Sequence, residues 1–202
     1  MERKSYCKGA HNNMTRGWQL FEQGKSSPEK YFYSALELRF GIESRLREYL
    51  EYQDHVKEKK KKGWQIAALG KDVEEAFSGC VDEVRVKVCS EGHPLVLFKY
   101  TPVVPDLKSI GERLGDYLHA PKKGSLETQE QWDEFESILE RGFHLLEYAC
   151  SGNLLGVPLL RPGSRQGIFN ASVSEDQKKV LKALYAKGGD VAINAEYLPP
   201  PV

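Results

Sequence analysis

The chain has 202 residues, of which 40% are hydrophobic and 29% are charged. These values are typical of one globular domain, with or without an appendage, and they exclude a disordered or collagen-like chain. Its 29 Lys and Arg balance 29 Asp and Glu, so the formal net charge is zero. A protein that binds nucleic acid by bulk positive charge is therefore excluded, and any such contact requires a local patch.

The first predicted elements are an arm and two helices. Residues 1–27 are expected to form a polar N-terminal arm that includes a short helix over 15–23. Ser26 and Glu29 have the spacing of a capping box, which marks a helix start. They predict a long helix over 28–57 that ends in a run of lysines, which favour the C-terminal end of a helix dipole.

The middle of the chain alternates between helical and strand patterns. A second helix is predicted over 64–77. Valines that alternate with charged residues then predict a β-hairpin over 84–101. A helix over 107–119 follows, and Pro121 ends it. The helix over 129–150 carries the most regular apolar stripe in the chain.

The last segment, 153–202, is predicted to hold a second hairpin over 157–171, a helix over 175–187 and a proline-rich tail that starts at Leu198. The fold class expected from these elements is mainly α. An antiparallel helical bundle over 28–152 would carry one or two inserted or appended β-hairpins.

The long helix places two charges within an apolar face. On a helical wheel, that face holds Phe32, Ala35, Leu36, Leu38, Ile42, Leu46, Tyr49 and Leu50. The opposite face, expected to meet solvent, holds Ser34, Glu37, Ser44, Arg45, Glu48 and Glu51. Arg39 and Glu43 fall in the middle of the apolar face, four residues apart, so they can pair. Burying two charges is costly, so the pair either serves a functional site or fixes the register of the helix.

The helix over 107–119 carries a second candidate pair. Arg113 lies near its apolar face and His119 lies in its last turn. An arginine offers charge-assisted hydrogen bonds to phosphoryl oxygens. A histidine can move a proton on or off a ribose 2′-hydroxyl near neutral pH. On an ideal helix the two residues are about 120° apart, so they would face one phosphate only if the helix end unwinds.

Two segments carry a resemblance to a known family. One is the Arg-x5-His pattern from Arg113 to His119, and the other is the Ala-Leu-Glu-Leu-Arg-Phe-Gly-Ile-Glu segment over 35–43. Together they resemble the HEPN superfamily of helical-bundle proteins, common in prokaryotic toxin and phage-defence systems. The resemblance covers about residues 28–150, with the hairpin as an insertion. Leu114 follows the arginine, where the family often has a polar residue.

The resemblance implies a metal-independent RNA endonuclease of a toxin–antitoxin or antiviral defence system. His119 would activate the 2′-hydroxyl or protonate the leaving group, and Arg113 would stabilise the pentacoordinate phosphate. Arg39, Glu43 and Asp116 would orient these two residues.

The family resemblance also implies a homodimer whose two motifs face one cleft. Lys122 and Lys123 are the candidate RNA-binding residues beside it. A neutralising or activating partner protein is a further expected partner. The alternative is a non-catalytic helical module that binds a nucleotide or a partner protein, or fixes a dimer, and Leu114 favours this alternative. Whether the chain is an enzyme stays open at this point.

The aromatic residues are the candidates for core packing and for stacking on bases. Trp18, Trp64 and Trp132 are expected to anchor the core, which leaves Phe98 and Tyr100 of the hairpin as candidates for stacking on bases.

The cysteines and the apolar runs of the chain predict the state of its thiols and its location in the cell. The four cysteines have neither CxxC spacing nor a nearby histidine, so we expect free thiols, no metal and no cofactor. No apolar run approaches the roughly 20 residues that span a membrane. A cytoplasmic location without membrane contact is expected.

Overall fold

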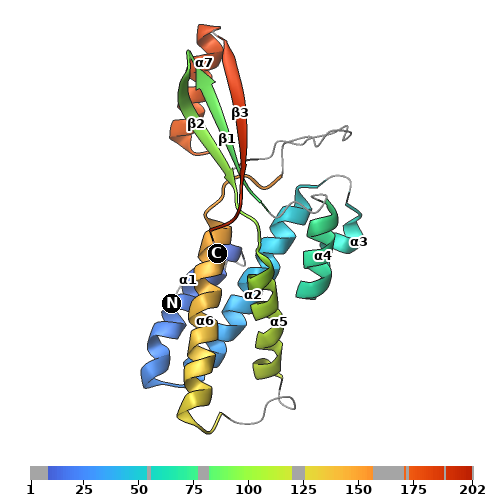
Figure 1. Cartoon of the computed structure of the whole chain (residues 1–202), viewed down its shortest axis with the longest axis vertical. Coiled ribbons are helices and arrows are strands. Elements are labelled where there is room, and N and C mark those ends of the chain that lie inside the picture. The colour runs from blue at the N-terminus through green and yellow to red at the C-terminus, as the bar shows by residue number, and fades with distance from the viewer. Residues whose placement is uncertain are drawn as a thin grey trace, which may run out of the picture.

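The computed structural model describes residues 9–53, 56–76, 82–119, 126–156, 171, 173–188 and 190–201. These residues form a helical bundle and a narrow arm that projects from one end of it (Figure 1). The helices of the bundle are α1 (Ala10–Gln23), the 3-10 helix η1 (Gly24–Ser26), α2 (Glu29–Glu51), α3 (Glu58–Lys61), α4 (Ile66–Ala76), α5 (Pro105–Leu118) and α6 (Gln129–Cys150). The arm contains β1 (Glu83–Ser90), β2 (His93–Tyr100), α7 (Glu175–Lys187) and β3 (Val191–Leu198). The prediction of a mainly helical protein with a small antiparallel sheet is confirmed.

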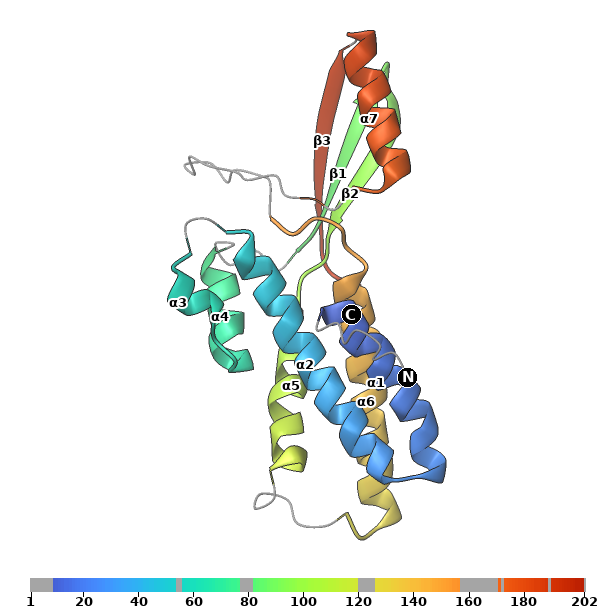
Figure 2. The same cartoon turned by 180° about the vertical axis from the view of Figure 1, so that it is seen from behind.

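Helix α2 lies at the centre of the bundle and contacts α1, α4, α5 and α6 (Figures 1 and 2). Its apolar side chains Leu38, Ile42 and Leu46 are fully buried, and burying each contributes roughly 1.5–3 kcal/mol. Helix α6 approaches α2 closely at Gly142, where an added Cβ would lie 2.6 Å from Leu38 Cδ2. The close approach of these two helices therefore depends on a glycine. None of the helices in the described ranges is long and apolar enough to cross a membrane.

Capping boxes set the starts of two helices where the sequence predicted them. The Thr128 side chain accepts from the Gln131 N–H, and the Gln131 side chain accepts from the Thr128 N–H at 3.1 Å. Ser174 and Gln177 repeat the arrangement at α7. The predicted helices over 129–150 and 175–187 are both confirmed, because a reciprocal cap satisfies backbone donors that the first helical turn leaves free.

The predicted end of the long helix is wrong. Helix α2 stops at Glu51, and the lysine run forms the separate short helix α3. The Lys60 ammonium pairs with Asp72 at 2.7 Å and with Glu75 at 2.8 Å, both on α4. These contacts hold the lysine run against α4, so it does not continue the axis of α2.

The face of α2 that the sequence assigned to solvent is largely covered by α1. The Ser34 hydroxyl is buried and donates to the Gly17 carbonyl at 2.8 Å. The N–H of Ala10 donates to Glu48 Oε1 at 2.9 Å, so α1 starts there, ahead of the predicted start at 15. The solvent assignment is wrong because a helical wheel ranks residues by polarity, and polar pairs between two helices give the same pattern as solvated side chains.

The arm is a three-stranded antiparallel sheet in the order β2-β1-β3, with α7 over one face (Figure 2). The predicted hairpin is confirmed by the pairing of Val84 with Tyr100 and of Val88 with Val96. Phe98 and Tyr100 are buried on the face of the sheet that α7 covers. They do not form the exposed stacking surface that the sequence predicted. The predicted hairpin over 157–171 lies outside the described residues, apart from an isolated bridge between Leu154 and Ala171.

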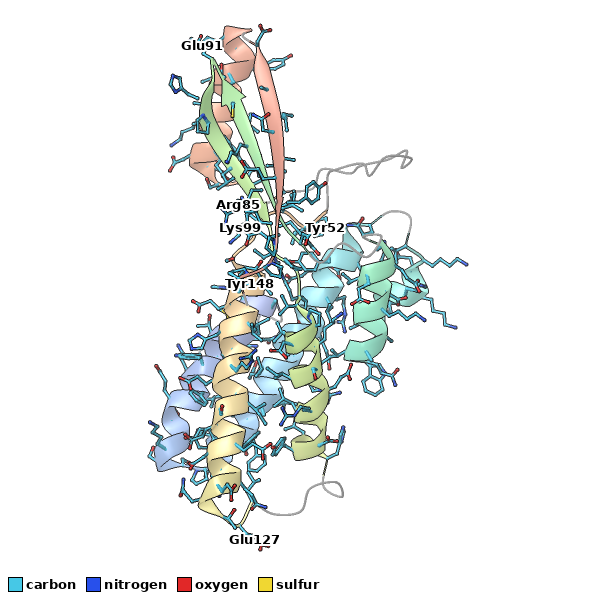
Figure 3. All side chains as sticks on the ribbon, viewed as in Figure 1. Tyr52, Arg85, Glu91, Lys99, Glu127 and Tyr148 are labelled. Atoms are coloured by element: carbon cyan, nitrogen blue, oxygen red, sulfur yellow. The ribbon has the colours of Figure 1, made fainter. Side chains whose placement is uncertain are left out.

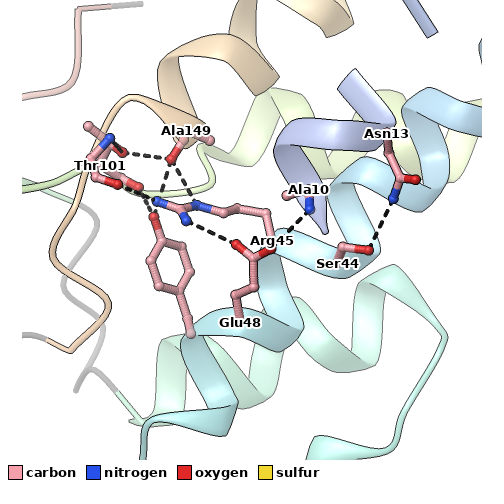
Figure 4. A network of polar contacts seen from close by, with 9 residues as sticks. Ala10, Asn13, Ser44, Arg45, Glu48, Thr101 and Ala149 are labelled. Atoms are coloured by element: carbon pink, nitrogen blue, oxygen red, sulfur yellow. Dashed lines mark hydrogen bonds and ion pairs between the residues drawn. The ribbon is translucent and has the colours of Figure 1, made fainter. Parts of the chain in front are cut away.

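A buried polar network joins the arm to the bundle (Figure 4). Arg45 is 5% exposed and donates to the Ala149 carbonyl at 2.9 Å and to the Gly152 carbonyl at 3.1 Å. The Thr101 hydroxyl donates to the same Ala149 carbonyl at 2.7 Å. The sequence placed Arg45 on the solvent face. In the fold it binds the Ala149 carbonyl, which the end of α6 leaves without a helical partner, and the Gly152 carbonyl just after the helix.

Candidate functional site

An open groove lies on the bundle between α2, the end of α5 and the segment that precedes α4. Its volume is about 500 Å³. The residues that line it are Phe32, Tyr33, Leu36, Arg39, Phe40, Glu43, Trp64, Leu118 and His119. Three of the five predicted catalytic residues, Arg39, Glu43 and His119, therefore share one surface.

Arg39 and Glu43 form an ion pair at the base of this groove. The Arg39 Nε donates to Glu43 Oε1 at 3.2 Å, and the two side chains are 16% and 12% exposed. Burial raises the pKa of the Glu43 carboxyl, while the nearby charges of Arg39 and Arg47 oppose that rise. The pair is thus mostly removed from water, with a remaining edge open to the groove.

Gly115 on α5 brings Arg39 and His119 together. An added Cβ at Gly115 would lie 2.7 Å from Arg39 Nη1 and 3.8 Å from His119 Cδ2. Both side chains therefore pack around the same point on α5, and the missing side chain of Gly115 makes the space. Helix α5 ends at Leu118, and His119 has extended backbone angles while its N–H still donates to the Gly115 carbonyl at 3.1 Å. The end of the helix directs the imidazole toward α2.

Arg113 does not belong to this cluster. It pairs with Glu134 on α6 at 3.0 Å, where both side chains are about half exposed, and it is not among the lining residues of the groove. Because α5 stays helical through Leu118, Arg113 keeps the face that an ideal helix gives it, about 120° from His119. Arg113 and His119 therefore do not meet at one groove within this chain.

The other predicted site residues lie apart from the groove or outside the residues that the structure describes. Asp116 is half-buried on α5 and is not among the lining residues. Lys122 and Lys123 lie outside the described residues.

Exposed aromatic side chains form the rim of the groove. Tyr33 is 55% exposed, Phe40 is 42% exposed and Trp64 is 62% exposed. The prediction that Trp64 anchors the core is therefore wrong, whereas Trp18 and Trp132 do pack against the core. Large exposed apolar groups gathered at one groove are typical of a binding site. The pattern that marks this rim in the sequence is Tyr33, Leu36 and Phe40, spaced three and four residues apart.

A second ionic cluster, which the sequence analysis missed, lies where the sheet meets the end of α6. The Glu83 side chain is 1% exposed and contacts Arg85 Nε at 2.6 Å, Lys99 Nζ at 3.1 Å and the Tyr148 hydroxyl at 3.0 Å. Figure 3 shows Arg85, Lys99 and Tyr148 close together at this junction. Burial alone raises the pKa of the Glu83 carboxyl, but its three donors outweigh that effect and the pKa is lowered overall. The cluster fixes the base of the arm.

Metal ligands do not gather in the described part of the chain: it holds no group of three or more His, Cys, Asp or Glu side chains placed to bind an ion. Comparison of the chain with family models, with curated proteins and with solved structures finds no match.

Proposed function

We propose that the groove binds single-stranded RNA and cleaves it without a metal ion, as a HEPN-like ribonuclease does. The observation that carries the proposal is the position of Arg39 beside His119, both packed around Gly115. The family resemblance rests on the segment that contains Arg39 and on the motif that ends at His119. Their convergence on one groove supports the proposal.

The chemistry requires a proton acceptor and a cation at one phosphate. The His119 imidazole takes the proton of a ribose 2′-hydroxyl, and the 2′-oxygen attacks the adjacent phosphorus. The bond from phosphorus to the 5′-oxygen breaks, and the leaving oxygen takes a proton from water. The products are a cyclic 2′,3′-phosphate and a 5′-hydroxyl end.

Arg39 takes the role that the resemblance gave to Arg113. Its guanidinium packs at Gly115, as His119 does, and Glu43 holds its Nε, so we assign its terminal nitrogens to the phosphate. A positioned guanidinium stabilises the charge that develops on the phosphoryl oxygens. Glu43 is a positioning residue because it acts through Arg39.

The aromatic rim supplies sequence-tolerant binding. A base that stacks on an exposed aromatic side chain gains about 1–3 kcal/mol. Tyr33, Phe40 and Trp64 surround the Arg39 site, so they can hold bases on either side of the phosphate that is cleaved. This mode of binding suits a chain with no net charge, because stacking does not depend on bulk positive charge.

A cleavage assay in EDTA tests the proposal. The full chain is incubated with a single-stranded RNA, and the ends of the products are identified. The His119→Ala and Arg39→Met variants should lose roughly a hundredfold or more in rate, while the Arg113→Met variant keeps the wild-type rate. The proposal fails if wild-type protein does not cleave RNA in EDTA, or if Arg113→Met abolishes cleavage and Arg39→Met does not.

A second candidate function is a non-catalytic binding module. Two observations favour it: Arg113 is engaged by Glu134, and Glu43 neutralises the charge of Arg39. In that case the groove takes an apolar segment of a partner protein, since exposed Trp, Tyr and Arg side chains are typical of such interfaces. Labelled RNA that neither binds nor is cleaved would favour this candidate. Cyclic phosphate products would exclude it.

The cellular role and the partners follow from the resemblance alone. We propose a defence or toxin role in which an associated protein restrains or activates the cleavage. Toxicity of the wild-type gene on expression, relieved by His119→Ala, would support this role. Equal growth with both genes would contradict it.

A further inference from the structure

The outer edge of β3 pairs with no further strand in the part of the chain that the structure describes. Strand β1 is central in the sheet, and among the described residues β3 pairs with β1 alone. The outer edge of β2 is covered, because Asn153 accepts from the Lys99 N–H at 2.9 Å and the Leu154 N–H donates to the Lys99 carbonyl at 3.0 Å. Gln177 adds a hydrogen bond to the Leu97 carbonyl at 3.4 Å. Among the described residues, hydrogen bonds therefore cover the outer edge of β2 but not the outer edge of β3.

An exposed apolar row runs along β3. Val191 is 48% exposed, Ile193 is 65% exposed and Tyr197 is 46% exposed. Ile193 lies opposite Val88 and Tyr197 lies opposite Val84, so the row belongs to the same sheet face as the buried valines of β1. Helix α7 contacts β2 and leaves β3 to one side (Figure 2). The apolar face of the sheet thus extends beyond the helix that covers it.

The sequence of β3 has none of the features that usually keep an edge strand from pairing. Residues 191–198 contain no Lys, Arg or Pro, and their one charge is Glu196. That carboxylate faces the opposite side of the sheet and is neutralised by Lys87 at 2.7 Å. Edge strands in soluble proteins are normally protected by lysine, proline or a bulge. An unprotected edge beside an apolar row indicates a strand that pairs with another chain.

We propose that β3 pairs antiparallel with β3 of a second copy of this chain, so that the two sheets form one sheet of six strands. A two-fold axis normal to the sheet, placed at Asn194, puts Ile193 opposite Ala195 of the second copy. The same axis puts Val191 opposite Tyr197 of the second copy. Such an interface is isologous and closes after two subunits.

The match of apolar side chains favours a second copy as the occupant. With the axis at Asn194, Glu196 lies opposite Ala192 of the second copy, so the two carboxylates do not face each other. Apolar side chains meet apolar side chains on one face, which is the favourable cross-strand pairing. The strand therefore pairs with itself without a contact between like charges and with apolar side chains facing apolar side chains.

The shape of the molecule accommodates this pairing. The arm projects from one end of the bundle (Figure 1), and antiparallel pairing of two arms places the two bundles at opposite ends of the dimer. The groove that contains Arg39 lies on the bundle, so both grooves stay open. This dimer keeps the two grooves apart, whereas the family resemblance implied a homodimer whose two motifs face one cleft. It does not depend on the proposed ribonuclease function.

The test is the mass of the full chain in solution, measured by light scattering and by sedimentation over a wide range of concentrations. Wild-type protein should be a dimer. Ile193→Glu should raise the dimer dissociation constant by roughly a hundredfold or more, because it places a charge in the apolar row twice per dimer. Leu97→Glu on the opposite edge strand and Phe40→Glu in the groove are matched controls, at 47% and 42% exposure, and should remain dimers.

Hydrogen exchange on wild-type protein gives an independent measurement. The amides of 191–198 should exchange more slowly as the protein concentration rises, while those of α5 should not change. The proposal is overturned if the wild-type chain is a monomer at every concentration. It is also overturned if the dimer survives Ile193→Glu, or if Phe40→Glu dissociates it.

Discussion

Replacing Arg45 with methionine tests the network that joins the arm to the bundle. The substitution keeps an unbranched apolar chain but removes hydrogen bonds to the Ala149 and Gly152 carbonyls at 2.9 and 3.1 Å. The Ala149 carbonyl keeps Thr101 as a donor, whereas Gly152 loses the arginine. Hydrogen bonds from a charged donor contribute about 1.5–3 kcal/mol each, and relief of the buried charge offsets part of that loss. We expect the free energy of unfolding to fall by about 3 kcal/mol.

Urea denaturation followed by circular dichroism measures this change, and thermal unfolding should show a loss of roughly 6–12 °C for a chain of this size. Arg141→Met is the matched control. Arg141 pairs with the Asp106 carboxylate, and the two side chains are 62% and 50% exposed. A surface pair of this kind contributes about 0–1 kcal/mol. A loss below about 1 kcal/mol for Arg45→Met would refute the structural role assigned to this network.

Three further substitutions test the packing and the electrostatics. Gly115→Ala places a Cβ 2.7 Å from Arg39 Nη1, so RNA cleavage should fall while stability in urea does not; unchanged cleavage would contradict the role of Arg39. Gly142→Ala forces Leu38 and α6 apart and should destabilise the protein by about 1–3 kcal/mol in the same assay; a change below about 0.5 kcal/mol would contradict the packing. The pKa of Glu83 is lowered in the fold, so its ionised form stabilises the protein above the ordinary carboxyl pKa and loses that effect as pH falls. The stability difference between wild type and Glu83→Gln should be largest near pH 7 and shrink below about pH 4; a difference independent of pH would contradict the ion pairs.

Local signals in the sequence predicted much of the secondary structure. Helix α6 was predictable because Thr128 and Gln131 cap its start and a single apolar stripe runs along it. The β1–β2 hairpin was predictable because its valines alternate with charged residues. Strand β3 was missed, although Val191, Ile193, Ala195 and Tyr197 alternate in the same way, because its partner lies far away in the chain.

Polar residues that contact distant elements were harder to predict. Arg45 looked solvated because its acceptors are backbone carbonyls near the end of α6, and backbone carbonyls carry no sequence signal. Arg39 and Glu43 were recognised as unusual because two charges interrupt an apolar face. The part that Gly115 plays in bringing Arg39 to His119 could not be predicted, because it depends on how α5 lies against α2.

We propose that Arg39, His119 and the aromatic rim form one RNA site to which Arg113 does not belong. The most direct measurement is an NMR titration with a short single-stranded RNA that carries a 2′-deoxy sugar at the scissile position to prevent cleavage. The side-chain signals of Arg39, His119 and Trp64 should shift together on binding, and the signal of Arg113 should not. A shift of Arg113 without Arg39 and His119, or no shift of any of them at saturating RNA, would contradict the claim.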